Sequence, residues 1–216
     1  DTALSMTVAE DAGAPSGAVG SLISAFTGGV TDQDSGAAKG IAITGSDQTN
    51  GTWYYTTNGG TTWTTVGTVS NTSALLLADN GSTRLYFAPS ANYNGTSTAA
   101  LTVRAWDQTS GTAGTKVTTA SNGGTTAFSS ATDTIDVTVS AVNDAPTNLA
   151  LSANSVAENA ANGTVIGTVT GTDPDAGDTK TYSFTDSAGG RFTINSSTGV
   201  ITVADGSLLN YEAATS

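Results

Sequence analysis

Two pairs of aspartates, Asp32-x-Asp34 and Asp173-x-Asp175, each follow a stretch that is rich in apolar and β-branched residues. Two carboxylates at this spacing, together with backbone carbonyls, are hard oxygen ligands that suit calcium, which accepts about six to eight oxygens in flexible geometry. An isolated pair has a simpler explanation, because aspartate in a turn commonly accepts hydrogen bonds from nearby backbone amides. The pairs alone leave both interpretations open.

The surroundings of the two pairs are also repeated. The pattern V-A-E-[DN]-A occurs at residues 8–12 and 156–160, and each copy is followed by an apolar stretch and then by T-D-x-D-x-G. Glutamate occurs at only three positions, and two of them, Glu10 and Glu158, are equivalent in this repeat. Self-similarity of this kind predicts two related domains. The polar turn at residues 143–146, which Pro146 stiffens, places their boundary near residue 144, giving domains 1–144 and 145–216.

Short stretches with β-branched or aromatic residues and Gly, Asn, Asp or Ser at their ends recur along the chain, which predicts an all-β fold of sandwiches. Strands are expected at residues 4–8, 18–23, 39–44, 52–57, 62–66, 74–77, 84–88, 101–106 and 134–139, then at 149–151, 164–169, 181–184, 192–194 and 200–203. Residues 111–130 are expected to form a long mobile loop or an irregular hairpin. The second domain is expected to lack its last two strands, so that another chain supplies them or the domain is marginally stable alone.

The composition excludes several classes of function. The chain has no Cys and no His, so Cys/His zinc sites, Ser-His-Asp triads, thiol nucleophiles and disulfides are excluded. Six basic residues against 18 acidic ones give a net charge of −12, which argues against nucleic acid and anionic membranes as partners. No apolar run is long enough to insert into a membrane. Excess carboxylates repel one another unless cations neutralise them.

Several motifs together resemble cadherin-like repeats, including the bacterial repeats of large surface and RTX-type adhesins. The motifs are AED at 9–11, DQD at 32–34, NDAP at 143–146, AEN at 157–159, DPD at 173–175 and NYE at 210–212, with the longer stretches 84–96, 101–111 and 134–146. The resemblance implies tandem Greek-key β-sandwiches of the cadherin/immunoglobulin-like kind, with Ca²⁺ bound between successive domains.

The resemblance also implies which residues are metal ligands at three poles of the domains. At the internal joint these are Glu10, Asp11, Asn94, Asn143, Asp144, Asp173 and Asp175. At the upstream pole they are Asp1, Asp32, Asp34 and Asp107, and at the downstream pole Glu158 and Glu212. Ala141 replaces the usual linker Asp, and Asn94 stands where the second domain has Glu212. The joint is therefore expected to hold fewer or weaker calcium ions than the family pattern implies.

Residues 56–63, TTNGGTTW, resemble an Asp-box hairpin with Asn58 in the Asp position. The neighbouring aromatic residues Trp53, Tyr54, Tyr55 and Trp63 are expected either to pack in the core and hairpin or to form a platform on which sugars stack.

These observations predict a calcium-dependent structural extender segment of a bacterial cell-surface adhesin or filament, secreted and without enzymatic activity. Its partners would be neighbouring repeats of the same polypeptide or other copies of itself. The alternative is a glycan-binding or homophilic self-association module.

Overall fold

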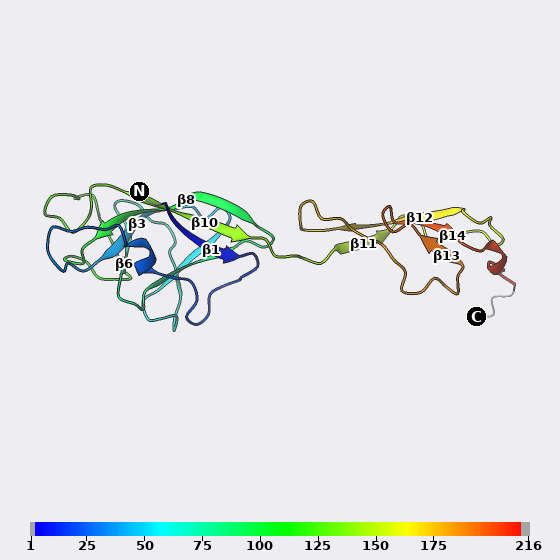
Figure 1. The fold of residues 1–216 in the computed structure, drawn as a ribbon, viewed down its shortest axis with the longest axis horizontal. Coiled ribbons are helices and arrows are strands. Elements are labelled where there is room, and N and C mark those ends of the chain that lie inside the picture. Colours follow the sequence, from blue (N-terminus) through cyan, green and yellow to red (C-terminus); the bar gives the residue numbers. More distant parts are fainter. Residues whose placement is uncertain (1–2, 213–216) are drawn as a thin grey trace. The chain divides into compact units, whose positions relative to one another are not determined.

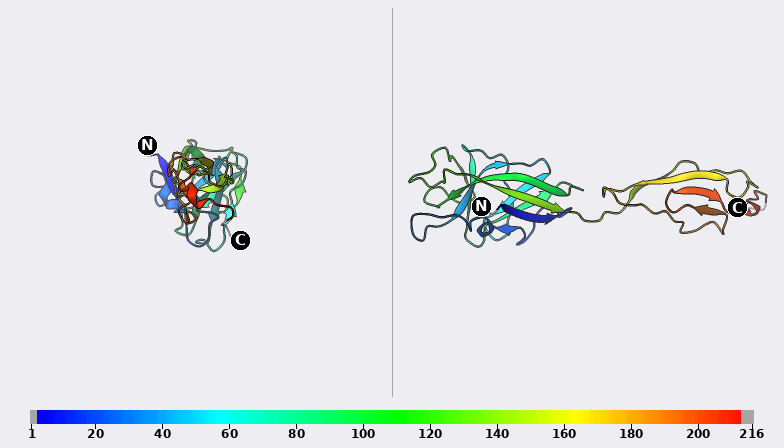
Figure 2. Two further views of the ribbon diagram at one scale, coloured as in Figure 1. Left: turned by 90° about the vertical axis from the view of Figure 1, so that its right-hand side faces the viewer. Right: turned by 45° about the horizontal axis from the view of Figure 1, so that its top comes forward.

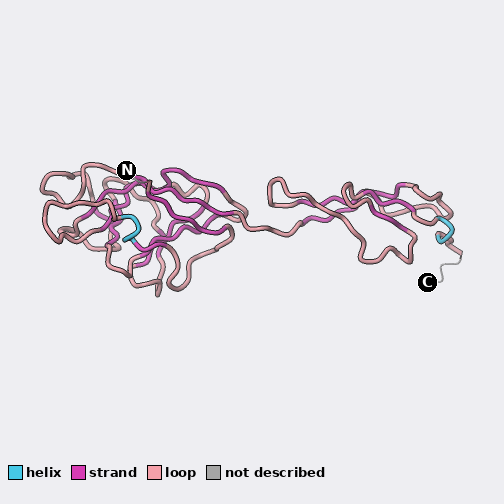
Figure 3. Tube along the Cα trace, in the orientation of Figure 1, coloured by secondary structure: helices cyan, strands magenta, loops and turns pink. Residues whose placement is uncertain are grey.

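The computed structural model describes residues 3–212, and the chain divides into two compact units, residues 1–142 (unit 1) and 143–216 (unit 2) (Figure 1). Both units consist of strands and loops, with two short 3₁₀ helices, η1 (Ile23–Phe26) and η2 (Gly206–Leu208), as the only helical turns in the described part (Figure 3). No helix among these residues has the length and apolar character needed to cross a membrane. The predicted all-β fold class is confirmed.

Unit 1 is built from two sheets. The first has the strand order β1-β10-β8-β3-β6-β9 and the second the order β2-β7-β4-β5. The strands of the first sheet are β1 (Leu4–Ala9), β3 (Gly40–Ser46), β6 (Ala74–Ala78), β8 (Gly95–Trp106), β9 (Lys116–Val117) and β10 (Asp133–Ser140). Those of the second are β2 (Ser21–Leu22), β4 (Gly51–Thr56), β5 (Thr64–Thr65) and β7 (Arg84–Pro89). All ladders are antiparallel except β1 with β10, which is parallel.

The main core of unit 1 lies between these two sheets. Strands alternate between the two faces, so every second side chain of β3, β10 and β7 points inward. Trp53 of β4 and Phe87 of β7 pack with ring centroids 4.8 Å apart, and both are buried against residues of the first sheet such as Ile43 and Val137. Burial of these side chains accounts for most of the stabilisation of the unit, at roughly 1.5–3 kcal/mol for each large apolar side chain.

A second, smaller core covers the outer face of the first sheet. Strand β6 reads ALLLA and is buried at every position, so it faces apolar side chains on both sides. Its outward Leu76 packs with Trp106 and with Phe128 from the long segment 107–131. Gly111, at φ +81°, lets this segment turn directly over Leu76, where a Cβ atom would collide with the leucine side chain. The Arg104 guanidinium donates to the carbonyl oxygens of residues 129 and 130 at 2.9 and 2.7 Å.

The structure differs from the expectations in unit 1 at residues 111–130, at 18–23 and at 62–66, where the strand is reduced to β5. Residues 111–130, expected to form a long mobile loop or an irregular hairpin, contain the short strand β9, which pairs with β6, and they pack against the sheet through Ala127 and Phe128. Its apolar side chains lie far apart in a sequence dominated by Gly, Ser and Thr, which is why the pattern suggested a loop. The expected strand 18–23 is reduced to β2, because the chain turns into η1 at Ile23 and buries Ile23 and Phe26 in the core.

Unit 2 has one four-stranded sheet with the order β11-β12-β14-β13 among its described residues (Figure 2). The strands are β11 (Thr147–Leu151), β12 (Val165–Thr172), β13 (Phe192–Ile194) and β14 (Val200–Val203), and every ladder is antiparallel. Ile201 and Val203 are its buried large apolar residues, whereas Leu149 is 76% exposed and Val165 63% exposed. Among the described residues of unit 2, no second sheet covers a face of this sheet as in unit 1.

The expected strand 181–184 is wrong, since these residues have no strand structure. The amide of Tyr182 donates to the carbonyl of Ser196 at 2.9 Å, but no ladder follows. A strand needs a neighbour along its length, and the described part of unit 2 contains no second sheet that would provide one.

Candidate metal centre

Glu10 follows the last residue of β1 and lies almost fully buried, with 3% of its surface exposed. Its backbone amide extends the parallel ladder by donating to the carbonyl of Ser140 at 2.9 Å. The Asn94 side-chain amide donates to both carboxylate oxygens at 3.3 and 3.2 Å, and the backbone amide of Val142 donates to Oε2 at 3.1 Å. The carboxylate therefore fixes the end of unit 1 to the beginning of the linker.

Asp11 lies next to this carboxylate in the chain and has a left-handed backbone conformation, φ 58°. Its Oδ1 accepts from the amide of Asn92 at 3.4 Å, in the same loop that carries Asn94. The following loop is held by the Tyr86 hydroxyl, which donates to the carbonyls of Ala12 and Gly13 at 3.2 Å each. Burial of this hydroxyl raises the pKa of Tyr86. Glu10, Asp11 and Asn94 are thus brought to one end of unit 1.

A second group of acidic residues lies at the linker end of unit 2. The Asp144 amide donates to Oδ2 of Asp175 at 2.6 Å, and the Asn143 side chain donates to the carbonyl of Asp144 at 3.1 Å. Asp173 Oδ1 accepts from the amide of Asp175 at 3.1 Å, which orders the turn. Hydrogen bonds from nearby backbone amides, the simpler explanation for an Asp pair, are therefore present here. They use only part of the acceptor capacity of the carboxylate oxygens.

Asp178 joins this group, although it was not among the ligands predicted from the sequence. Carboxylate oxygens of Asp173, Asp175 and Asp178 all lie within 4.8 Å of one another. Gly177, at φ +98°, and a bond of 3.3 Å from the Asp178 amide to the Asp175 carbonyl turn the chain back on itself. The spacing D-P-D-A-G-D could have predicted this third carboxylate. Gly before an acidic residue in a tight loop lets the chain turn, which brings that residue close to the first two aspartates.

The upstream residues of unit 1 form a looser group. Asp32, Asp34 and Asp107 line one cavity of about 680 Å³, together with Lys39. Asp32 Oδ1 accepts from the amide of Asp34 at 2.8 Å, the same bond that links Asp173 and Asp175. Asp107 Oδ1 accepts from the amide and hydroxyl of Thr109 at 2.8 and 2.7 Å. Asp1, the fourth residue expected here, lies outside the described residues.

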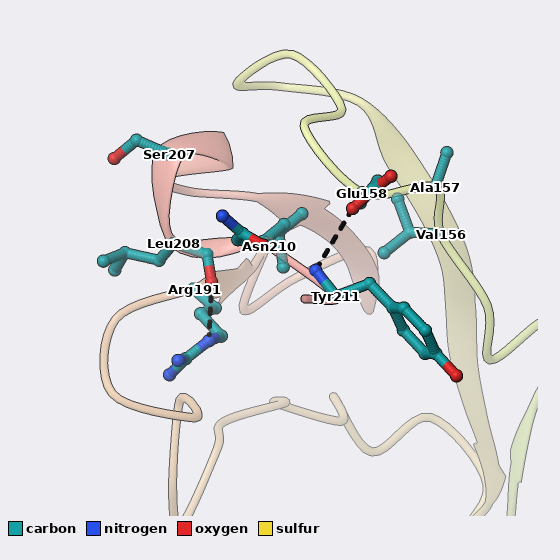
Figure 4. Close-up of a pocket in the computed structure, with 9 residues that line it drawn as sticks. Val156, Ala157, Glu158, Arg191, Ser207, Leu208, Asn210 and Tyr211 are labelled. Carbon is teal, nitrogen blue, oxygen red and sulfur yellow. Dashed lines mark hydrogen bonds between the residues drawn. The ribbon is translucent and has the colours of Figure 1, made fainter. Parts of the chain in front are cut away.

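The downstream residues lie beside a cavity of about 470 Å³ in unit 2 (Figure 4). The exposed Glu158 accepts from the backbone amide of Tyr211 at 3.2 Å, and the two atoms face each other across the cavity wall in Figure 4. Asp205 caps η2, which leads into this segment, and hydrogen bonds from the Ser207 hydroxyl and amide lower the pKa of Asp205. Glu212 is exposed and is not part of the cavity lining.

The aromatic residues of the first unit pack rather than form an open platform. Trp53 has no exposed surface, and its indole nitrogen donates to the carbonyl of Asp47 at 3.0 Å. Trp63 packs edge-on against Tyr86 with ring centroids 5.9 Å apart and donates to the carbonyl of Gly17 at 3.1 Å. Asn58 Oδ1 accepts from the Thr56 hydroxyl and the Thr62 amide, at 2.8 and 3.0 Å, and so orders the hairpin turn.

The chemistry of the acidic group at Asp173, Asp175 and Asp178 fits a hard divalent cation. All of its ligand atoms are carboxylate oxygens, and the chain contains neither a Cys thiolate nor a His imidazole. Each pair of negative charges about 4 Å apart repels by about 1 kcal/mol in water, and by more where solvent is partly excluded. A bound cation removes this repulsion and adds direct coordination.

Comparisons with known proteins found one family match in the second unit and similar folds among solved structures. Residues 152–216 match the cadherin domain model. Among solved structures, human CDH23 EC21-23 is 17% identical with a TM-score of 0.50 over 96% of this chain and 62% of its own. Protocadherin Gamma B2 extracellular cadherin domains 3-6 is 18% identical with a TM-score of 0.52 over 95% of this chain and 42% of its own. Residues 152–216 thus match the cadherin domain family, and the fold of the chain is similar to that of cadherin domains.

The chain spans less than two thirds of the length of either structure. At these identities the likeness concerns the fold. No curated protein sequence matches the chain. The match of residues 152–216 and the similar fold support the resemblance to cadherin-like repeats that the motifs indicated.

Proposed function

We propose that this chain is a calcium-dependent structural extender segment of a bacterial cell-surface adhesin or filament, in which calcium stiffens the joint between the two domains near residue 144. The observation that carries the proposal is the hydrogen bonding of the linker. A carboxylate of each unit holds a linker amide: Glu10 binds the amide of Val142, and Asp175 binds the amide of Asp144.

Covalent geometry alone limits how far apart these carboxylates can be. Two residues span at most about 7 Å of extended chain, so carboxylate oxygens bonded to the amides of residues 142 and 144 lie within about 13 Å of each other. Asp11 and Asn94 belong to the first group, and Asn143, Asp173 and Asp178 to the second. This density of oxygen ligands around a short linker supports calcium binding there.

The mechanism follows from charge. Without metal, the acidic groups repel one another and leave the linker free to bend; calcium bridges carboxylates on both sides of residue 143 and restricts that bending. Extracellular calcium modules bind at about 0.1–1 mM. A ligand present at about 100 times its dissociation constant stabilises the bound form by roughly 2.7 kcal/mol per site.

Two other groups are proposed as half-sites toward neighbouring repeats of the same polypeptide. The first is Asp32, Asp34 and Asp107 with Asp1, and the second is Glu158 with Glu212. The cadherin domain match and the millimolar calcium range of extracellular modules are consistent with a location outside the cell or at its surface. The bacterial assignment rests on the resemblance of residues 84–96, 101–111 and 134–146 to bacterial surface repeats. We propose no enzymatic activity for this module.

Calorimetry and small-angle X-ray scattering in calcium and then in EDTA test the proposal. Calcium is expected to raise the melting temperature and to narrow the distribution of interatomic distances, because it restricts the linker. Magnesium at the same concentration serves as the control, since it keeps its own water ligands and demands stricter geometry. If calcium changes neither the melting temperature nor the scattering curve, the model is wrong.

The alternative of a glycan-binding module has little support from the aromatic residues, because Trp53 is buried and Trp63 packs against Tyr86. Homophilic self-association has a specific observation in its favour, namely the exposed Leu149 and Leu151 on the sheet of unit 2. Sedimentation velocity across a concentration series distinguishes it from a purely monomeric spacer.

A further inference from the structure

The carboxylate of Glu10 is held by neutral donors alone within the described part of the chain. Its Oε1 accepts from the Asn94 side chain at 3.3 Å, and its Oε2 accepts from the same side chain at 3.2 Å and from the Val142 amide at 3.1 Å. Only 3% of Glu10 is exposed, so water does not replace these donors. A buried carboxylate needs donors or a cation around it, and here Asn94 provides most of them.

The Asn94 side chain presents its nitrogen, and not its oxygen, to Glu10. An ionised carboxylate only accepts hydrogen bonds, so an amide that contacts both of its oxygens donates from Nδ2. Calcium binds oxygen atoms, and the Glu10 oxygens are the ligands that this end of unit 1 offers most directly. The Asn94 amide therefore competes with calcium for the same two atoms.

The strands of unit 1 fix where this amide lies. Glu10 directly follows β1, Asn94 directly precedes β8, and β10 lies between these two strands and pairs with both. Tyr93 anchors the loop before β8, since it packs against the main core and its hydroxyl lies 3.0 Å from the Ser97 hydroxyl. The backbone on both sides of the contact is thus ordered by the fold itself, and no ion is needed to bring Asn94 to Glu10.

Asn94 is also the partner that leaves Glu10 at the lowest cost. It is exposed, so its side chain can turn into water without any change in the core. The Val142 donor, in contrast, is a backbone amide, and it moves only with the chain. Among the described residues Asn94 is the one donor to Oε1, so its departure frees that oxygen completely and leaves Oε2 with the Val142 bond.

We propose that Asn94 sets the calcium response of unit 1 by occupying the Glu10 carboxylate until calcium displaces it. The inference rests on the proposed binding of calcium at Glu10. Without calcium, the amide keeps this end of unit 1 ordered; with calcium, the loss of its two hydrogen bonds raises the concentration of ion that is required. The second unit has a carboxylate, Glu212, at the corresponding place, so this control belongs to unit 1 alone.

Urea unfolding of the full chain tests the first half of the proposal. Tryptophan fluorescence reports unit 1 specifically, because all three tryptophans, at positions 53, 63 and 106, lie in it. In EDTA, Asn94→Asp is expected to lower the urea midpoint by about 0.5–1 M, since it places a second carboxylate against the buried one. Asn92→Asp adds the same charge at an exposed position of the same loop and is expected to shift the midpoint by less than about 0.2 M.

A calcium series with the same readout tests the second half. The rise of the midpoint with calcium gives the apparent dissociation constant of folded unit 1. Asn94→Ala has no amide to displace and is expected to bind calcium about threefold to tenfold more tightly than the wild-type chain, although it is less stable in EDTA. Asn94→Asp is expected to bind at least about tenfold more tightly, because it also adds a charged oxygen ligand. A residue with a merely structural role would lower stability without tightening calcium binding.

The variants separate this inference from the calcium proposal beneath it. Weaker or unchanged calcium binding by Asn94→Ala, while the wild-type chain binds calcium, overturns the inference and leaves the proposed function standing; weaker binding would make Asn94 a ligand. Equal midpoints of Asn94→Asp and Asn92→Asp in EDTA also overturn it, since the effect would then come from net charge. If Asn94→Asp does not fold in EDTA, the Asn94→Ala series still decides. A chain in which neither the wild type nor any variant responds to calcium overturns both proposals.

Discussion

Glu10 and Glu158 stand in matching pentapeptides, yet their side chains have opposite surroundings. Glu10 is buried and accepts three hydrogen bonds, two from the Asn94 side chain and one from the Val142 amide. Glu158 is exposed and accepts one, from the Tyr211 amide. A buried acceptor that loses its partners costs more than an exposed one, because water replaces the lost bonds only at the exposed site. The two residues thus form a natural matched pair.

Glu10→Gln is expected to destabilise unit 1 by about 1–3 kcal/mol even without calcium. The new amide places a donor against the donor of Asn94, so at least one bond is lost. Urea denaturation in EDTA, followed by the fluorescence of the buried Trp53, measures the change. Glu158→Gln, the same substitution at the exposed equivalent, is expected to change stability by less than about 0.5 kcal/mol. Equal effects of the two substitutions would contradict the role assigned to Glu10.

Asp178→Asn is expected to weaken calcium binding about threefold to tenfold, because it removes one of three carboxylates whose oxygens lie within 4.8 Å. Isothermal titration calorimetry of the whole chain with calcium measures the affinity. Asp186→Asn removes the same charge from the same unit away from the group and serves as the control. If both variants lower the affinity equally, the effect comes from net charge and Asp178 is not a ligand.

At the scale of the elements, strand β6 decides how the long segment 107–131 folds. Because β6 is apolar at all five positions, one face of it would be exposed to water unless something covers it. Phe128 and Val117 of the segment provide that cover, together with the bridge between Trp106 and Phe128. The segment is therefore held by tertiary packing and not by its own sequence pattern.

Phe128→Ala is expected to destabilise unit 1 by about 3 kcal/mol and to release the segment from the sheet. Lys116 in β9 provides a direct readout, because release of the segment exposes the peptide bond after Lys116 to trypsin. The Lys116 side chain is otherwise held by a bond of 2.7 Å to the carbonyl of Thr68. Mass spectrometry of tryptic fragments under native conditions measures cleavage at this bond. Thr125→Ala, at an exposed site in the same segment, is expected to leave it protected.

At the scale of the whole molecule, the net charge of −12 acts against the folded state wherever carboxylates are crowded together. Specific calcium binding and general screening by salt both relieve that repulsion, but in different ways. Screening shortens the Debye length from about 10 Å at 0.1 M salt to about 3 Å at 1 M. Coordination acts only where oxygens converge, as they do at Asp173, Asp175 and Asp178.

Sodium chloride is therefore expected to raise the melting temperature in EDTA gradually between 0.1 and 1 M, whereas calcium raises it at millimolar concentration. Differential scanning calorimetry at constant ionic strength separates the two effects. The salt dependence in saturating calcium is expected to be weaker, because the crowded charges are already neutralised. A melting temperature that falls with added sodium chloride in EDTA would show that charge repulsion is not the destabilising force.

The sequence by itself determined the all-β fold class and the repeat that relates Glu10 to Glu158. Both depend on local patterns: β-branched residues between turn-forming residues, and motifs preserved at corresponding positions. It also gave the approximate positions of most strands, but not the cover over β6 or the absence of a strand at residues 181–184.

Only the tertiary structure decided the rest. It buried Glu10 but left Glu158 exposed, returned Asp178 to the aspartate pair, and removed Trp53 from any binding surface. The physical reason is that burial and convergence depend on which distant segments pack against a residue. In unit 1 strand β10 covers the end of β1, and in unit 2 no described strand covers the equivalent stretch.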